Sequence, residues 1–252
     1  MTDRNAQAGM NYQDPRIAAI YDSANPFAQD AKFYLSLAGP ESRSVLDLGC
    51  GTGTLCCALA ELGHCVTGVD PAPAMLAIAR TKTFSERVAW VESSAQIYRS
   101  QRRFDLIVMT GHAFQMLLSD DDVLAVLETM RLHLKPRGSI AFETRNPRLD
   151  WVGAWNACSR TISGGQIVET LNITTHDGEF ISFETTYQLP DKTLTTSTTL
   201  RFPLREHIES LIDRSGLVVR DVFGDWHAGP FEPACSQEII FIAGMPTSDA
   251  TL

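Results

Sequence analysis

Short apolar runs alternate with helical patterns over the first 145 residues of the chain. Five of these runs are apolar nearly throughout, which is typical of strands buried on both faces of a sheet. They lie at residues 44–48, 64–69, 88–91, 105–109 and 139–143. Helical segments separate them, and the clearest helix start is Ser119 followed by three aspartates. Strands that alternate with helices in this way predict a parallel, doubly wound α/β sheet.

The pattern changes after Pro147, where β-rich segments replace the alternation of strands and helices. Three such segments follow, at residues 166–175, 179–189 and 193–202. Asp-Gly and Pro-Asp pairs separate them, and both pairs are turn signals. The segments predict a three-stranded antiparallel sheet inserted into the α/β domain. We expect apolar residues such as Ile167, Phe180 and Phe183 on one of its faces and threonines on the other.

Helical patterns also flank the two sheets. Residues 14–37 have helical periodicity with a break at Pro26, and a helix over 204–215 leads into strands at 217–223 and 238–243. Residues 1–11 are expected to be loose. This organisation predicts N-terminal helices that cover the site, an α/β domain in two segments, and an inserted lid. Their respective boundaries are 1–39, then 40–147 with 203–245, and 148–202.

Composition narrows the class of protein. The chain has 252 residues, of which 44% are hydrophobic, and this suits one globular domain with an insertion. Its net charge is -9, and its densest basic group (Arg99, Arg102 and Arg103) lies between two predicted strands, where a solvated loop is expected. Because polyanion binding relies on clustered Lys and Arg, we do not expect a nucleic-acid partner.

The sequence also lacks clear signs of a membrane span, a signal peptide or a metal site. No apolar run is long enough to span a bilayer, and the first 14 residues lack the order of a signal peptide, so we expect a cytoplasmic protein without a membrane partner. The six cysteines include no CxxC pair, which favours reduced thiols and predicts no metal site.

A glycine-rich turn follows the first predicted strand. Gly49, Gly51 and Gly53 allow the backbone to turn sharply and to approach a ligand closely. Asp70 ends the second predicted strand, where an acid can accept both hydroxyls of a ribose. The dinucleotide fingerprint is GxGxxG, whereas the spacing here is GxGxG with Thr54 in the place of the third glycine. The turn therefore predicts a nucleoside ligand and weakens the case for a dinucleotide.

These residues resemble the glycine motif of class I S-adenosylmethionine-dependent methyltransferases. Residues 104–107 and 134–139 are similar to the family's fourth- and fifth-strand motifs, and the last helix and strands fit its sixth and seventh strands. The resemblance covers 40–145 and 204–244. It implies a Rossmann-like, doubly wound seven-stranded sheet that is parallel except for one antiparallel strand. The small antiparallel β lid after the fifth strand resembles the roof of small-molecule N- and O-methyltransferases.

The resemblance also implies cofactor contacts around the glycine turn. The backbone of Gly49, Cys50 and Gly51 would line the methionine portion and the ribose of S-adenosylmethionine. Asp70 would hold the ribose diol. Tyr21 matches an N-terminal helix that closes over the cofactor in related enzymes.

Further cofactor contacts are implied on the next strands. Pro71 and Met75 would flank the adenine, and Thr110 would lie near the sulfonium. Ser94, followed by Ala95, stands where the family usually has an aspartate for the adenine amino group. A serine hydroxyl can accept the same hydrogen bond, but less strongly than a carboxylate.

His112 is the best candidate for a general base, because ligands of open α/β sheets bind at the carboxyl ends of the strands. The alternative is that His112 only shapes its loop or holds the carboxylate of the cofactor. Glu143 and Arg145 end the fifth strand at the same edge. They either form a pair that anchors the lid or contact the substrate.

Three aromatic residues have a structural and a functional interpretation. Trp151 and Trp155 are expected mainly to pack the base of the lid, with stacking on a substrate as the alternative. His227, on the loop before the last strand, could face the site or lie outside it.

We therefore expect an enzyme that transfers a methyl group from S-adenosylmethionine to an N or O atom of a small molecule, with S-adenosylhomocysteine as product. It would act as a monomer or homodimer. One alternative is a non-catalytic module that binds the nucleoside cofactor. A less favoured alternative is an NAD(P)-dependent oxidoreductase, which the GxGxG spacing and the lack of a Tyr-x-x-x-Lys pair disfavour.

Overall fold

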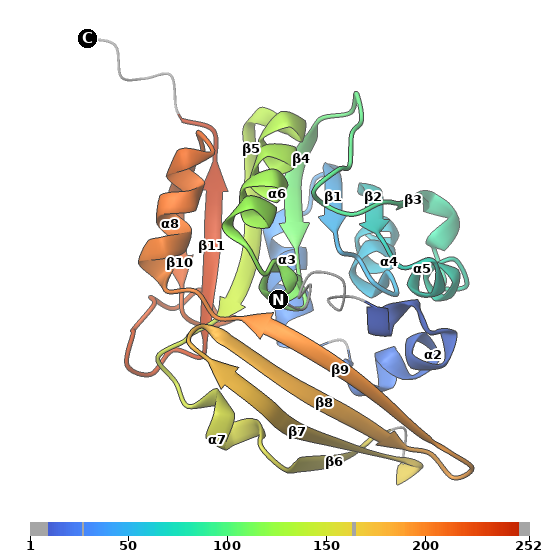
Figure 1. Ribbon diagram of the computed structural model, residues 1–252. Helices are drawn as coiled ribbons and strands as arrows, with labels where there is room; N and C mark the ends of the chain where they lie inside the picture. The colour runs from blue at the N-terminus through green and yellow to red at the C-terminus, as the bar shows by residue number, and fades with distance from the viewer. Residues whose placement is uncertain (1–9, 27, 163–164, 247–252) are drawn as a thin grey trace.

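The computed structural model describes residues 10–26, 28–162 and 165–246. A seven-stranded sheet forms its main body, and a four-stranded sheet lies across the carboxyl end of strand β4 (Figure 1). The strand order of the larger sheet is β10-β11-β5-β4-β1-β2-β3. Among the described strands of this sheet, β11 alone runs in the direction opposite to all the others. The predicted fold class, including one antiparallel strand and an inserted antiparallel lid, is confirmed.

The larger sheet has the predicted strands with small differences at their ends. Its strands are β1 (Ser44–Leu48), β2 (Cys65–Asp70), β3 (Val88–Glu92), β4 (Phe104–Met109), β5 (Leu134–Arg145), β10 (Val218–Phe223) and β11 (Glu238–Gly244). Strand β5 begins five residues before the predicted start at Ser139. The Lys-Pro-Arg-Gly segment that precedes the predicted start lies inside β5, where the register with β4 shifts between Phe104 and Leu106.

Helices cover both faces of this sheet, which explains why its strands are apolar nearly throughout. The helices are α3 (Gln29–Ala38), α4 (Thr54–Glu61), α5 (Pro73–Ala79), α6 (Asp120–His133) and α8 (Arg205–Arg214). Helices α6 and α8 pack into one apolar cluster with Ile107, Phe142 and Phe241. Helices α3 and α4 pack into a second cluster with Val45 and Val108. The central strands are thus enclosed, and their carboxyl ends are left for a site.

The lid has four strands where three were predicted. They are β6 (Cys158–Ile162), β7 (Ile167–Asp177), β8 (Phe180–Gln188) and β9 (Thr193–Arg201). Strand β6 was not predicted, because its sequence has no alternation of apolar and polar residues. Four of its five residues are exposed and are polar or small. A short helix, α7 (Trp151–Trp155), precedes the lid, and the Asp150 side chain accepts a hydrogen bond from its Gly153 N–H at 2.7 Å.

The predicted faces of the lid are wrong in one respect. Successive side chains of a strand point to opposite faces, so Phe180 and Phe183 cannot share one. The face turned to the interior carries Phe183, Thr185 and Thr196, which line a cavity. Threonines are therefore part of the inner face and are not confined to the outer one.

Helix α2 (Pro15–Ala24) joins the lid to the α/β domain. One side of α2 packs on the lid through Ile17 and Ile20, in a cluster with Ile162 and Leu194. Its other side places Ala18 against α5. The chain before α2 forms a short 3-10 helix, η1 (Met10–Gln13), so the loose segment expected over 1–11 is contradicted at its last two residues. Residues 1–9 lie outside the described chain.

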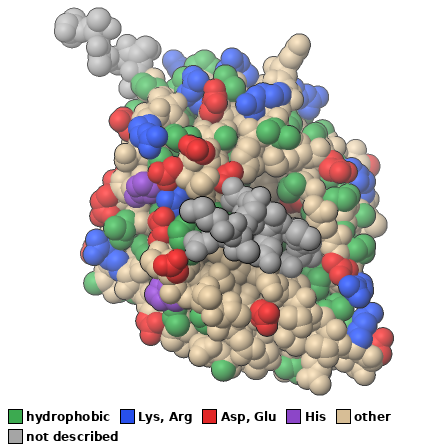
Figure 2. Space-filling view, in the orientation of Figure 1, with side chains coloured by type: hydrophobic (Ala, Val, Ile, Leu, Met, Phe, Trp, Pro, Cys, Tyr) green, Lys and Arg blue, Asp and Glu red, His purple; other side chains and the backbone are tan. Residues whose placement is uncertain are grey.

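In the part of the chain that the structure describes, no helix is both long and apolar enough to cross a bilayer. On the face shown in Figure 2, several Lys and Arg side chains gather at the end opposite the lid, whereas the lid surface is mostly uncharged.

Gly53 tests how tightly the glycine turn is packed. Its φ is +71°, and an added Cβ would lie 2.3 Å from the Trp90 ring, whereas Gly63, with φ +88°, has open space around the same position. Gly63→Ala should cost about 1–2 kcal/mol from the left-handed backbone alone. Gly53→Ala should cost about 1–3 kcal/mol more, because overpacking is added to the same backbone penalty. Urea unfolding of both variants measures the difference, and equal losses would show that the Trp90 contact is unimportant.

Candidate functional site

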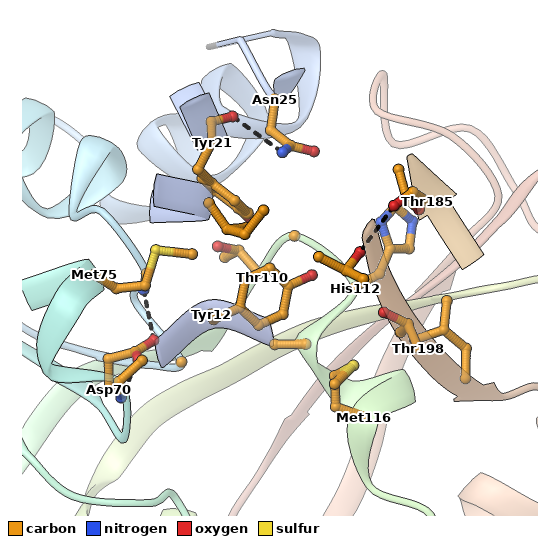
Figure 3. Close-up of a pocket in the computed structure, with 18 of the residues that line it drawn as sticks. Tyr12, Tyr21, Asn25, Asp70, Met75, Thr110, His112, Met116, Thr185 and Thr198 are labelled. Carbon is orange, nitrogen blue, oxygen red and sulfur yellow. Dashed lines mark hydrogen bonds between the residues drawn. The ribbon is translucent and has the colours of Figure 1, made fainter. Parts of the chain in front are cut away.

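A cavity of about 730 Å³ lies between the α/β domain, helix α2 and the lid. Figure 3 shows Asp70 and Met75 at one end of it, Thr185 and Thr198 at the other, and Thr110 between them. An adjoining cavity of about 560 Å³ is also lined by Thr110 and by residues of the glycine turn. These volumes are in the range of small-molecule sites. The site thus has one end built by the α/β domain and another built by the lid.

The glycine turn is held against the end of β2. The N–H groups of Gly49 and Cys50 both donate to the carbonyl of Val69, at 2.8 and 3.0 Å. Gly49 and Gly51 have φ of +77° and +54°, which side chains rarely adopt. A Cβ at Gly49 would lie 3.2 Å from that of Ala113. At these two glycines the turn therefore presents its backbone to the cavity.

Asp70 is fixed by the same turn. Its Oδ2 accepts a hydrogen bond from the Gly51 N–H, and its Oδ1 accepts one from the Ala72 N–H, each at 2.8 Å. Burial raises the pKa of Asp70, and the hydrogen bonds from Ala72 and Gly51 act in the opposite direction. A carboxylate has about four lone-pair sites, so two remain for a ligand in the cavity. Two acceptor sites on one carboxylate match, in number, the two hydroxyls of a vicinal diol.

Helix α2 is tied down over the glycine turn by Asp22. The Thr52 hydroxyl donates to Asp22 Oδ1 at 2.5 Å, and Lys82 Nζ lies 2.6 Å from Asp22 Oδ2. The neighbouring Tyr21 lines both cavities, and a Cβ on Gly51 would lie 3.9 Å from its ring. The sequence pointed to Tyr21 but not to Asp22, whose partners Thr52 and Lys82 lie 30 and 60 residues away in the chain.

The residues assigned to the adenine lie together on one side. Pro71, Met75, Ser94 and Ala95 all line the larger cavity. Asp122 lines it too, and its Oδ1 accepts a hydrogen bond from Gln96 Nε2 at 3.4 Å. The sequence identified Asp122 only as part of a helix start. The structure thus places a carboxylate near the side where Ser94 stands in for the expected acid.

His112 belongs to a hydrogen-bonded group of buried acids. The ring nitrogen Nε2 of His112 lies 2.8 Å from Glu238 Oε2. The backbone N–H of His112 donates a hydrogen bond to Glu143 Oε1 at 2.6 Å. The other oxygen of Glu143 accepts from the Tyr34 hydroxyl. Burial raises the pKa of Glu143, while His112 and Tyr34 act in the opposite direction. Of the two alternatives for Glu143 and Arg145, the pair that anchors the lid is wrong, because Glu143 is bonded to Tyr34 and to the backbone N–H of His112.

Aromatic and hydroxyl side chains line the lid end of the cavity. They include Tyr12, Trp155, Phe183, Thr185 and Tyr187. Tyr12 and Tyr21 pack edge to face, with ring centroids 5.7 Å apart. Sequence reasoning missed Tyr12, which adjoins the stretch expected to be loose. Trp155 lines the cavity as well as packing against Trp151, with ring centroids 5.4 Å apart.

Nearly all the residues singled out in the sequence meet in one place. The larger cavity is lined by Tyr21, Gly49, Gly51, Asp70, Pro71, Met75, Ser94, Ala95, Thr110 and His112. Cys50 lines only the adjoining cavity, and burial raises the pKa of its thiol. His227 is exposed and lines neither cavity. The roles of these residues toward a ligand stay predictions.

Comparison with known proteins supports the family seen in the sequence. Residues 45–138 match the family described as "Methyltransferase domain". A cypemycin N-terminal methyltransferase from Streptomyces sp is 33% identical over 107 residues, which are 42% of this chain and 44% of the relative. A ubiquinone biosynthesis O-methyltransferase from Rhodopseudomonas palustris is 29% identical over 156 residues, 61% of this chain and 56% of the relative. The chain thus spans about half the length of the curated relatives it matches.

A solved structure extends the likeness of the fold to the lid. The CcbJ methyltransferase from Streptomyces caelestis aligns with a TM-score of 0.81 and covers 94% of this chain and 98% of its own. Its sequence identity is 21%, so this likeness concerns the fold.

Asp22→Asn tests whether the Asp22 contacts hold helix α2 in place. The substitution keeps the size of the side chain and removes the charge that pairs with Lys82. Because Asp22 is partly exposed, the loss should be about 0.5–1 kcal/mol, and amides of α2 should exchange about two- to fivefold faster. Hydrogen exchange measures this, with helix α6 as internal reference. Unchanged exchange in α2 would mean that its apolar contacts alone hold it.

Proposed function

We propose that this protein, whose residues 45–138 form a class I S-adenosylmethionine-dependent methyltransferase domain, transfers a methyl group to an N or O atom of a small molecule. The observation that carries the proposal is the cavity itself. Asp70, fixed by two backbone N–H groups, lies at one end of it, and the lid encloses the other end. Relatives named as N- and O-methyltransferases support the same reaction class.

The residues present fit S-adenosylmethionine. Gly49 and Gly51 leave room for close approach, and Asp70 has lone pairs free for the ribose hydroxyls. Met75 is buried beside them and offers an apolar surface to the adenine. When bound, the cofactor supplies an electrophilic methyl group on its sulfonium. The protein supplies position, orientation and exclusion of water.

His112 and Glu238 can manage the proton of the acceptor. When Glu238 accepts a hydrogen bond from Nε2–H, the imidazole holds its lone pair on Nδ1. No hydrogen bond to Nδ1 is found among the residues that the structure describes, and His112 lines the cavity. We propose that Nδ1 takes the proton of a hydroxyl or ammonium acceptor. An amine that is already neutral would need no base.

The lid end of the cavity favours an enzyme over a module that only binds the cofactor. Trp155, Phe183 and Thr185 enclose space beyond the residues assigned to the cofactor, and a binding module has no need of it. The NAD(P) oxidoreductase is disfavoured by the GxGxG spacing. Monomeric or dimeric state and cytoplasmic location stay predictions.

A methyl-transfer screen tests the proposed reaction. The protein is incubated with S-adenosylmethionine labelled in the methyl group and with a panel of small amines, phenols and alcohols. Label should pass to at least one N or O acceptor of the panel. Tight S-adenosylhomocysteine binding without transfer to any of a broad panel would favour the non-catalytic module.

Asp70→Ala tests the placement of the ribose. The variant removes charge-assisted hydrogen bonds to the ribose. The loss of one such bond, worth about 1.5–3 kcal/mol, should already raise the Kd for S-adenosylhomocysteine by about 10- to 150-fold. Calorimetry measures the Kd. Asp105→Ala is the matched control, because Asp105 is bonded to Lys135 and Ser44 and lines neither cavity. An unchanged Kd for Asp70→Ala would place the ribose elsewhere.

His112→Gln and Glu238→Gln test the base. His112→Gln should lower kcat by about 100-fold with little change in S-adenosylhomocysteine affinity, as removal of a general base does. Glu238→Gln should lower kcat less, and the double variant should be no slower than His112→Gln, because Glu238 acts through His112. Kinetics with an acceptor from the screen measure this. Losses that multiply in the double variant would assign Glu238 a separate role.

A further inference from the structure

Arg145 is a cation of the cavity that the proposed reaction leaves unused. It ends β5 and lines both cavities. Its guanidinium lies over the ring of Trp155 at 4.9 Å and over that of Trp151 at 5.7 Å. Its Nη1 donates to Gln115 Oε1 at 2.8 Å. The immediate partners of this charge are thus a neutral amide and two aromatic faces.

The acids around Arg145 are committed to other groups. Glu143 accepts hydrogen bonds from Tyr34 and from the His112 N–H. Glu238 lies opposite Arg145 in the pairing of β5 with β11, but its carboxylate is bonded to His112. Among the described residues, Arg145 forms no ion pair with any acid.

Arg160 shows what a balanced arginine in the same cavity looks like. It lines both cavities too, but it is paired with Glu169 and donates to the carbonyl of Ala24 at 2.7 Å. Its charge is therefore compensated within the protein. The contrast singles out Arg145 as the cavity arginine whose fork is still open to a ligand.

An unbalanced guanidinium in a closed cavity favours an anion. Burial lowers the pKa of Arg145, and the more distant charges of Glu238 and Glu143 act in the opposite direction. Arginine nevertheless stays protonated in proteins. Its enclosed charge is therefore stabilised by interaction partners and not removed by loss of a proton. A carboxylate matches the guanidinium fork with two parallel hydrogen bonds.

We propose that Arg145 is an anion subsite that binds a carboxylate of the methyl acceptor, an inference that rests on the proposed function. The position of Arg145 supports the acceptor as the source of the carboxylate. Its guanidinium lies over the ring of Trp155, next to the lid, although Arg145 also lines the adjoining cavity together with Gly49. The methionine carboxylate of the cofactor is the other possible source.

The side chains that line the cavity near Arg145 indicate what the part of the acceptor beyond its carboxylate is like. Tyr12, Trp155, Phe183 and Tyr187 offer aromatic surface, which stacks well on a flat or apolar body. The acceptor class is therefore a small carboxylic acid with an aromatic or apolar body that carries the amino or hydroxyl group to be methylated.

Benzoate and benzamide, which have the same shape and differ in charge, probe the subsite directly. Each is titrated into the full chain saturated with S-adenosylhomocysteine. Tryptophan fluorescence reports binding, because Trp151 and Trp155 contact the Arg145 guanidinium. The wild type should bind benzoate about tenfold or more tightly than benzamide, as expected for one charge-assisted bidentate pair.

Three variants assign that preference to Arg145. Arg145→Met should abolish it, and Arg145→Lys should retain a part, because lysine keeps the charge but loses the fork. Arg205→Met is the control, since Arg205 also lies over an aromatic ring, that of Phe231 at 5.6 Å, but lines neither cavity. Thermal unfolding checks that each variant is folded. If Arg145→Met does not fold, Arg145→Lys alone tests the subsite. In that case, a preference for benzoate as large as that of the wild type would contradict bidentate binding by the guanidinium of Arg145.

The other outcomes separate this inference from the proposed function. Equal binding of the two probes to the wild type, or a preference that survives in Arg145→Met, overturns the anion subsite. If Arg145→Met instead weakens S-adenosylhomocysteine binding by about tenfold or more, Arg145 holds the cofactor's own carboxylate, and the acceptor subsite is wrong. A wild type that fails to bind S-adenosylhomocysteine contradicts the proposed function, while the two probes can still be compared on the free protein.

Discussion

Three hydrogen bonds hold the glycine turn of this protein against the end of β2. The N–H groups of Gly49 and Cys50 donate to the Val69 carbonyl, and that of Gly51 donates to the Asp70 carboxylate. They place a turn whose glycines expose their backbone beside a fixed acid, and this pairing forms one end of the cavity. Positive φ angles at the glycines make the turn possible, and helix α4 begins directly after it. Without this turn, Asp70 would lose one of its two backbone hydrogen-bond donors, and the cavity would lose the wall that the glycines form.

The roof of the cavity depends on contacts between parts that lie far apart in the sequence. Asp22 ties helix α2 to Thr52 and Lys82, while Arg160 of the lid donates to the carbonyl of Ala24 at the end of α2. Helix α2 therefore contacts both the glycine turn and the lid (Figure 1). Helix α2 thus joins the glycine-turn end of the cavity to its lid end.

The sequence was sufficient for features that are encoded locally. Apolar strands, helix starts and the glycine turn depend on residues close together in the chain, and they predicted the larger sheet and the place of Asp70. Features set by long-range pairing were missed. Glu238 reaches His112 only because β11 pairs antiparallel with β5, and no local pattern gives that register. Strand β6 is polar and exposed, so its place in the lid comes from pairing with β7.

Other differences follow from the chemistry of single positions. Asp122 fits a helix start so well that its second position, in the cavity wall, could not be inferred from the sequence. Phe180 and Phe183 were placed on one face of the lid although their spacing puts them on opposite faces. Arg145 could not be separated from a pair with Glu143 until the structure showed that Tyr34 and the His112 N–H occupy Glu143.

The most direct test of the account is calorimetric titration of the wild-type protein with S-adenosylhomocysteine and, separately, with NAD. The GxGxG turn and the fixed carboxylate of Asp70 predict saturable binding of S-adenosylhomocysteine with one molecule per chain and no measurable binding of NAD. Tight binding of NAD with none of S-adenosylhomocysteine would contradict the account at its foundation.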